Sequence, residues 1–316
     1  MKNVDIVVPC YNEEESLKDF YIETQKIFKT LPDYKFTYIF VNDGSKDQTL
    51  PMLEQMASFD KNIKYVSFSR NFGKEAAIYA GLQASTSELV CLIDADLQHP
   101  PALIPEMLAG IEEGYDCCAG RRVSRDGEPK IRSFFSRQFY KLINKMSDID
   151  LVDGAVDFRV MNRAYVDAVL QLSERQRFSK GLFTWIGFDT KWIEFKNIER
   201  ANGESKWSFF SLFKYAIDGV TSFSTVPLRF ATVIGAIVSA VSFIYLIYVL
   251  VRAIFVGIDT PGYTTTIFSI LFIGGIIILS CGILGEYIAR IYKESKNRPV
   301  YIVKKTNVDD KNKTNF

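Results

Sequence analysis

Two long apolar runs near the C-terminal end limit what this chain of 316 residues can form. The runs cover residues 230–250 and 264–285, and neither contains a charged residue. About 20 apolar residues cross the hydrocarbon core of a bilayer as a helix, and core helices of soluble proteins rarely stay uncharged over this length. The sequence therefore predicts a two-helix transmembrane hairpin rather than two buried helices of a soluble core.

Basic residues flank this hairpin on its outer sides, whereas residues 257–263 between the runs carry only Asp259. Cytoplasmic flanks of membrane helices are enriched in Lys and Arg, so we expect both termini and the N-terminal domain in the cytoplasm. We expect no signal peptide, because the chain opens on an apolar strand-like run without a basic and apolar leader. The flanking basic residues are Lys206, Lys214, Arg229, Arg290, Lys293, Lys296, Arg298, Lys304 and Lys305.

Charge and cysteine content narrow the function classes. A formal net charge of +1 gives no case for a nucleic-acid partner. The five cysteines lack metal-binding spacing, and the adjacent Cys117 and Cys118 suit a buried strand in a reducing compartment. The residues from Asn307 onward are polar and predict a frayed tail.

Ahead of the hairpin, short apolar runs alternate with helical patterns. This order favours an α/β fold with a mostly parallel sheet and helices on both of its faces. In such sheets ligands bind beyond the carboxyl ends of the strands. The predicted strands are 4–8, 36–41, 63–68, 89–93 and 115–119, and the predicted helices are 13–28, 48–59, 74–84 and 101–112.

Polar segments follow four of these strands, at residues 9–13, 42–45, 69–74 and 94–98. Each segment alone is typical of turns and helix caps. Four segments in register at one sheet edge nevertheless predict a binding site. No glycine-rich phosphate loop follows the first strand, which disfavours a P-loop ATPase or a simple nicotinamide enzyme.

Asp94, Asp96 and Gln98 carry the clearest chemistry. Two carboxylates and an amide oxygen at a strand end suit a hard divalent cation, Mg²⁺ or Mn²⁺. Such a cation neutralises a leaving nucleoside diphosphate, so sugar or phosphoryl transfer is the predicted reaction class. His99, the only histidine, precedes two prolines, and we interpret it as a helix-entry turn residue rather than a ligand.

The strand-end segments and the two apolar runs together resemble the family 2 inverting glycosyltransferases of GT-A fold. Within that family the chain is similar to the polyisoprenyl-phosphate glycosyltransferases, which include bactoprenol glucosyltransferases and dolichol-phosphate mannose synthases. The resemblance covers essentially the whole chain. It implies that Asp94, Asp96 and Gln98 surround the metal and the diphosphate. It also implies that Asp157 is the catalytic carboxylate, either as a general base or as an electrostatic and positioning group. The implied uridine pocket consists of Pro9, Tyr11, Glu13 and Asp43.

The acceptor side is predicted from apolar and basic patterning. Residues 130–146 place aromatic and aliphatic side chains at helical spacing among basic residues, which favours an interfacial helix over one packed on its own sheet. Guanidinium groups suit phosphate recognition. The residues assigned to the acceptor phosphate are Arg121, Arg122, Arg125 and Arg132. By the resemblance, Arg200, Ser205 and Lys206 belong to a segment that closes over the donor.

These observations predict a catalytic domain at 1–204, a juxtamembrane amphipathic segment at 205–226, two transmembrane helices within 227–290 and a cytoplasmic tail at 291–316. The resemblance implies a multi-pass enzyme of the bacterial cytoplasmic (inner) membrane that moves one sugar from a UDP-sugar to undecaprenyl (polyisoprenyl) phosphate for cell-envelope glycans. Glucose is the favoured sugar, with UDP-N-acetylhexosamine and UDP-aminoarabinose derivatives as open alternatives. Transfer to another lipid such as diacylglycerol, a non-catalytic membrane scaffold and a homo-oligomeric state also stay open.

Overall fold

An eight-stranded sheet in the order β7-β5-β6-β4-β1-β2-β3-β8 is the frame of the N-terminal part of the chain. The computed structural model describes residues 1–123, 144, 151–172, 174–196, 224–256 and 262–308. Only β6 and β8 run against the other strands of this sheet, so the mostly parallel α/β prediction is confirmed. The strands are β1 (Lys2–Cys10), β2 (Tyr34–Asn42), β3 (Ile63–Phe68), β4 (Leu89–Leu92), β5 (Cys117–Arg122), β6 (Ala155–Asn162), β7 (Thr190–Phe195) and β8 (Val303–Thr306).

Helices cover both faces of the sheet and enclose two apolar clusters. Along β1, Val4, Ile6 and Val8 belong to one cluster and Val7 to the other, because successive side chains of a strand point to opposite faces. The first face carries α1 (Leu17–Phe28), α2 (Thr49–Phe59) and α4 (Ile104–Glu112), and the second carries α3 (Lys74–Ala84), α6 (Arg163–Gln171) and α7 (Ser179–Trp185).

Helix α3 approaches the sheet closely because it carries glycine at position 81. A Cβ atom at Gly81 would lie only 2.2 Å from Cγ1 of Val7, so any larger residue would push the helix away from β1. The N-terminal end of the same helix carries Lys74, whose ammonium group reaches Asp94 beyond β4. The close packing of α3 therefore helps to set the position of Lys74.

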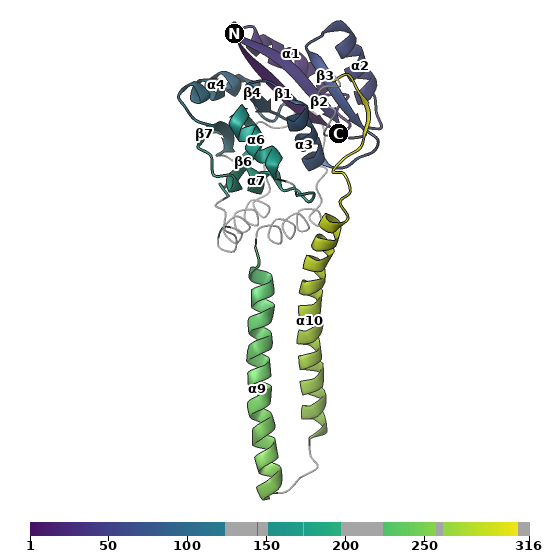
Figure 1. Cartoon of the computed structure of the whole chain (residues 1–316), viewed down its shortest axis with the longest axis vertical. Helices are drawn as coiled ribbons and strands as arrows, with labels where there is room; N and C mark the ends of the chain where they lie inside the picture. Colours follow the sequence, from purple (N-terminus) through teal and green to yellow (C-terminus); the bar gives the residue numbers. More distant parts are fainter. Residues whose placement is uncertain (124–143, 145–150, 173, 197–223, 257–261, 309–316) are drawn as a thin grey trace.

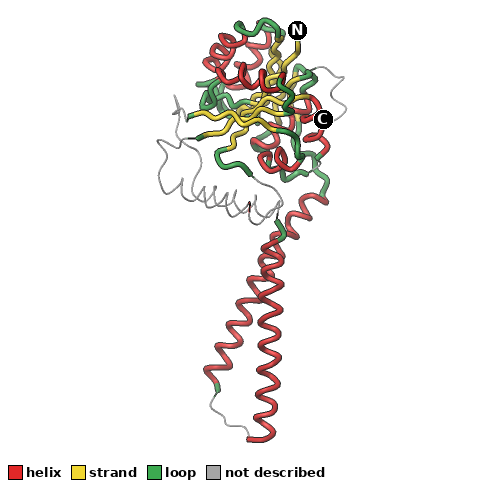
Figure 2. The backbone as a smooth tube through the Cα atoms, turned by 90° about the vertical axis from the view of Figure 1, so that its left-hand side faces the viewer, coloured by secondary structure: helices red, strands yellow, loops and turns green. Residues whose placement is uncertain are grey.

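Two long helices, α9 (Val226–Val256) and α10 (Tyr263–Ser295), extend from the part of the protein that contains the sheet, here called the head, and run side by side (Figures 1 and 2). Each contains a stretch long and apolar enough to cross a membrane, Val226–Tyr245 in α9 and Phe272–Ser295 in α10, and none of either stretch is buried within the protein. Phe255 is 82% exposed and Ile278 is 74% exposed. Core helices would be packed on several sides, so the predicted two-helix hairpin is confirmed and the soluble-core alternative is wrong, whereas its crossing of a membrane stays a prediction.

After α10 the chain returns to the edge of the sheet, where the yellow C-terminal segment lies beside β3 in Figure 1. Tyr301 stacks on Phe68 with ring centroids 4.7 Å apart. The Asn307 side chain accepts a hydrogen bond from the backbone N–H of Tyr65 at 2.6 Å, and Val308 is only 4% exposed. The prediction that the chain frays from Asn307 onward is therefore wrong for Asn307 and Val308, because both are fixed against β3.

Candidate active site

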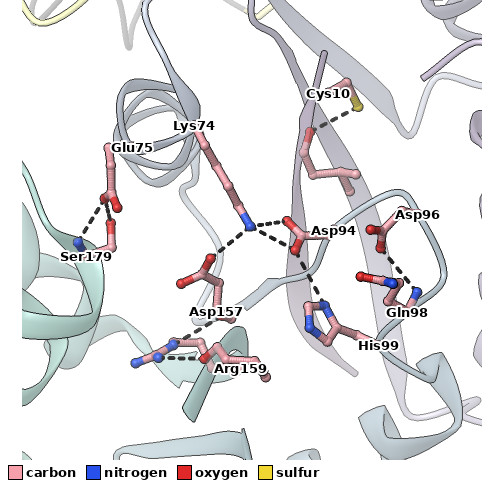
Figure 3. A network of polar contacts seen from close by, with 12 residues as sticks. Cys10, Lys74, Glu75, Asp94, Asp96, Gln98, His99, Asp157, Arg159 and Ser179 are labelled. Atoms are coloured by element: carbon pink, nitrogen blue, oxygen red, sulfur yellow. Dashed lines mark hydrogen bonds and ion pairs between the residues drawn. The ribbon is translucent and has the colours of Figure 1, made fainter. Parts of the chain in front are cut away.

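Strand ends and one helix N-terminus bring the predicted carboxylates together (Figure 3). Asp94 and Asp96 follow β4, and Asp157 lies on β6, the neighbour of β4 in the sheet. Lys74, the first residue of α3, points between Asp94 and Asp157. The residues predicted to bind a metal and to act in catalysis thus share one edge of the sheet.

Asp94, Asp96 and His99 each offer one ligand atom, and these atoms lie within 4.8 Å of one another. The His99 ring is 6% exposed and lies near Phe158, with ring centroids 5.9 Å apart. Its Nδ1 atom is 3.6 Å from Asp94, beyond hydrogen-bond distance, and has no hydrogen-bond partner in the described part of the chain. Two carboxylates beside such a buried imidazole nitrogen fit a divalent cation.

Gln98 lies beside Asp96 in Figure 3, and its backbone N–H donates to the Asp96 carboxylate at 3.1 Å. Leu97 between them has φ of 56°, a left-handed conformation that is uncommon for a residue of this type. This turn brings His99 next to Asp94, and because the short helix η1 (Pro101–Leu103) begins two residues later, His99 is also the predicted helix-entry turn residue. Its place as the single histidine beside two aspartates was the signal in the sequence for its position next to Asp94.

Lys74 bridges two carboxylates that come from different strands. Its Nζ atom lies 2.8 Å from a carboxylate oxygen of Asp94 and 2.8 Å from Oδ2 of Asp157. Burial opposes the charged form, but the charges of Asp157 and Asp94 outweigh it and raise the pKa of the Lys74 ammonium group. The sequence analysis included Lys74 in a strand-end segment but gave it no role, because no local pattern shows which distant carboxylates a lysine meets.

Asp157 is held as a carboxylate. Burial disfavours its charge, but Lys74 and Lys180 outweigh that effect and set the pKa of Asp157 well below its usual value. Arg159, two residues further along β6, is buried and donates hydrogen bonds to the backbone carbonyls of Asp157 and Val156. A carboxylate with such a low pKa accepts a proton poorly, so the geometry favours the electrostatic and positioning role of Asp157 over general base catalysis.

Glu75 follows Lys74 in the first turn of α3 and contacts a different segment. Its carboxylate accepts hydrogen bonds from the backbone N–H of Ser179, at 2.8 Å, and from the Ser179 hydroxyl. Burial and the nearby charge of Asp157 raise the pKa of Glu75 to about 7, although the Ser179 hydrogen bonds and Lys74 oppose the shift. The start of α3 is therefore fixed to the start of α7.

We expect the raised pKa of Glu75 to make the stability of the protein depend on pH. Between the ordinary pKa of a glutamate and pH 7, the native state holds a proton that the unfolded state releases, so the free energy of unfolding falls as pH rises through this range. A pKa raised from 4.5 to about 7 makes this fall at most about 3 kcal/mol. Melting temperatures in detergent at pH 5 and pH 8 should show wild type losing stability relative to Glu75→Gln, whose amide oxygen still accepts from Ser179. A constant difference between the two proteins would contradict the raised pKa.

The residues predicted for the uridine pocket lie at the ends of β1 and β2. Asp43 is 3% exposed, and its two carboxylate oxygens accept the backbone N–H groups of Phe72, at 2.6 Å, and Gly73, at 2.9 Å. Burial raises the pKa of Asp43 even though these hydrogen bonds oppose the shift. Asp43 thereby fixes the segment between β3 and α3, and a role toward the uridine base stays a prediction.

The turn after β1 is bound to the turn after β2 and to the start of α2. The backbone N–H of Glu13 donates to the Thr49 hydroxyl at 2.9 Å, and the Glu13 carboxylate accepts from the Ser16 hydroxyl at 2.7 Å. Pro9 and Cys10 are the last residues of β1, and Tyr11 is the first residue after the strand. Pro9 and Tyr11 are both partly exposed, so part of each is accessible at the predicted donor side.

Of the predicted phosphate-binding residues, Arg121 and Arg122 lie at the end of β5. The Arg121 guanidinium donates to the carbonyl of Asp153 at 3.2 Å and pairs with Glu194 at 3.3 Å. Arg122 is partly exposed. The other residues predicted for the acceptor and the closing segment lie outside the described residues, as do most of the predicted interfacial helix and of the juxtamembrane segment. They are Arg125, Arg132, Arg200, Ser205 and Lys206.

A cavity of about 250 Å³ lies on the α6 and α7 side of the sheet. Arg159 and Lys180 supply its cationic lining, and Phe183 and Trp192 supply aromatic lining. The Arg159 guanidinium stacks on Phe183 at 3.8 Å. Since Lys180 is also one of the two lysines that lower the Asp157 pKa, the cavity borders the carboxylate network.

Both the N-terminal part of the chain and the C-terminal hairpin are similar to known proteins. The family described as Glycosyl transferase family 2 matches residues 5–170, and the GtrB C-terminal hairpin matches residues 226–291. CsbB of Bacillus subtilis, which bears a glycosyltransferase name, is 48% identical over 98% of this chain and 93% of its own length. The SfII prophage-derived bactoprenol glucosyl transferase of Shigella flexneri is 40% identical over 96% of this chain and 98% of its own length. The prophage bactoprenol glucosyl transferase homolog of Escherichia coli is 39% identical over the same shares.

Proposed function

Because the chain belongs to glycosyl transferase family 2 and ends in the GtrB C-terminal hairpin, we propose that it transfers glucose from UDP-glucose to a polyisoprenyl phosphate. One observation carries the proposal: relatives named as bactoprenol glucosyl transferases match nearly the whole chain, catalytic part and hairpin together. The intact cluster of Lys74, Asp94 and Asp157 supports catalysis over the scaffold alternative. We propose Pro9, Tyr11, Glu13 and Asp43 for the uridine side and Arg121, Arg122, Arg125 and Arg132 for the acceptor phosphate.

The proposed donor site fits a divalent cation held by Asp94 and Asp96, with His99 or Gln98 beside them. A bound Mg²⁺ or Mn²⁺ would supply positive charge that offsets the negative charge of departing UDP. Lys74 adds a second fixed positive charge at the same edge of the sheet. A preorganised cation of this kind stabilises charge that develops in the transition state without reorganisation.

The proposed reaction needs little proton transfer. A phosphate monoester has a second pKa of about 6, so the lipid phosphate is already ionised at neutral pH. Its oxygen forms a bond to the anomeric carbon as the bond from that carbon to UDP breaks, and attack from the opposite side inverts the configuration. Asp157, kept anionic by Lys74, stabilises the positive charge that grows on the sugar ring.

We propose that the hairpin spans a bacterial cytoplasmic membrane with the head in the cytoplasm. Arg290 and Lys293 lie near the head end of α10, whereas Arg252 is at the far end of α9. The bias of basic residues therefore favours the head side as the cytoplasmic side. UDP-sugars are made in the cytoplasm, so this orientation also gives the site access to its proposed donor.

The direct test uses the purified full chain in detergent with undecaprenyl phosphate and a panel of UDP-glucose, UDP-N-acetylglucosamine, UDP-aminoarabinose and GDP-mannose. We expect glucosyl lipid and an equal amount of UDP from UDP-glucose, and little product from the other donors. Diacylglycerol in place of the lipid phosphate should give none. Transfer to diacylglycerol would replace the proposed acceptor, and absence of both product and released UDP with all donors would favour the scaffold alternative.

A further inference from the structure

The last turn of α10 is tied to the head by the carboxylate of Glu294. Its oxygens accept hydrogen bonds from the backbone N–H of Arg175, at 3.0 and 3.2 Å, and of Gln176, at 3.0 Å. The Arg175 side chain returns the contact, because its Nε atom donates to the carbonyl of Arg298 at 2.6 Å. The residues just before α7 are thus bound to the end of a membrane helix.

From this loop the contacts lead to the active site. Ser179, which begins α7, donates two hydrogen bonds to Glu75 in the first turn of α3. The residue before Glu75 is Lys74, which bridges Asp94 and Asp157. A loop held by Glu294 is therefore separated from the catalytic carboxylates only by Ser179 and the first turn of α3.

Two further contacts hold the middle of α3 to the same region. The Arg177 guanidinium lies 4.3 Å from the centre of the Tyr79 ring. Tyr301, beyond the end of α10, packs edge-on against Tyr79 and donates a hydrogen bond to Gln83 at 2.7 Å. One side of α3 is thus held by segments that the end of α10 positions.

We infer that Glu294 is a positioning residue that acts through the Arg175–Ser179 loop and Glu75 to fix Lys74 between Asp94 and Asp157. The membrane hairpin is then part of the active-site framework as well as an anchor. Residues 174–178 contain no helix or strand, so the loop depends on such outside contacts for its position. Removing the carboxylate leaves two backbone donors without their partner, which costs more than loss of a solvated contact. The catalytic part of this inference rests on the proposed function.

The variants Glu294→Ala and Glu294→Gln test the inference in the full chain. The matched control is Glu286→Ala, which removes the same group from the same helix, where it pairs with Arg290 at 3.8 Å rather than with the Arg175–Ser179 loop. A short-chain, water-soluble polyisoprenyl phosphate as acceptor removes delivery from the membrane as a limiting step. We expect kcat to fall about tenfold in Glu294→Ala, within the usual range for coupled positions, with Glu286→Ala close to wild type. Glu294→Gln should recover most of the rate, since its amide oxygen still accepts.

A double-mutant cycle with Glu75→Ala, which removes the acceptor of both Ser179 hydrogen bonds, shows whether the effect passes through α3. If it does, Glu294→Ala should reduce kcat far less in the Glu75→Ala background than in wild type, whereas additive losses would overturn the inference. Hydrogen exchange at residues 74–79 gives a readout that needs no activity. It should become faster in Glu294→Ala and stay unchanged in Glu286→Ala.

These outcomes separate the inference from the proposed function. Wild type that transfers no sugar would refute the function, and the exchange measurement would still test the contact path. Wild type that transfers glucose, with Glu294→Ala equal to it in rate and exchange, would refute the positioning role and leave the function standing. Equal losses in Glu294→Ala and Glu286→Ala would also refute it, because they would show a general effect on α10.

Discussion

Asp96→Asn is expected to abolish sugar transfer while the protein still folds and inserts into membranes. A neutral amide is a poor replacement for a carboxylate at a hard cation. The cation's contribution to the transition state is several kcal/mol, and each 1.36 kcal/mol is tenfold in rate, so transfer should fall about a thousandfold or more. Radiolabelled transfer to undecaprenyl phosphate measures the rate, and electron paramagnetic resonance of Mn²⁺ measures the affinity of the site.

Asp33→Asn provides the matched control for that change, because Asp33 is exposed and lies on the loop before β2, away from the strand ends that form the site. It should leave both rate and Mn²⁺ affinity unchanged. Undiminished turnover by Asp96→Asn, or by wild type in excess chelator, would remove the metal assignment.

Asp157→Asn should lower kcat by a factor of about 100 to 1,000, in line with the loss of one preorganised electrostatic group. Binding of UDP-glucose should persist, because Lys74 keeps its contact with Asp94. The wild-type rate should rise with pH as the acceptor phosphate ionises, near pH 6, with no contribution from Asp157 or Lys74, since Asp157 is already anionic and Lys74 stays charged above that range.

The pH dependence distinguishes the two roles left open for Asp157. Steady-state rates with lipid phosphate from pH 5 to pH 9 give the pH profile of transfer. Isothermal titration with UDP-glucose measures donor binding separately. A protein group titrating well away from the acceptor phosphate, and absent in Asp157→Asn, would restore general base catalysis. Asp167→Asn, an exposed carboxylate paired with Arg163, should behave as wild type.

The central strands could be predicted because they are buried on both faces and therefore appear as continuous apolar runs. Strand β6 was missed because it contains Asp157 and Arg159, two charged residues that interrupt the apolar run. Strand β8 has the sequence Val-Lys-Lys-Thr, and such a short polar segment is recognisable as a strand only through its pairing with β3.

The candidate site was predictable to the extent that it lies next to strand ends in the sequence. Asp94 and Asp96 follow one strand directly, so their type and spacing identified them. The importance of Lys74, Glu75 and His99 depends on partners from other elements, which one sequence does not place. Asp157 was assigned only by resemblance, since its strand carries no local sign of a catalytic group.

The pairing of β8 with β3 also affects the order in which the protein is built. Asn307 and Tyr65, which hydrogen-bond to each other, are 242 residues apart in the chain, and both long helices, α9 and α10, lie between them. During synthesis β8 leaves the ribosome after those helices, so until then β3 has an unpaired edge of the kind that promotes aggregation. Completion of the sheet thus waits for synthesis of both long helices, and a ribosome that stalls within α10 would leave a nascent chain with that edge open to chaperones and proteases.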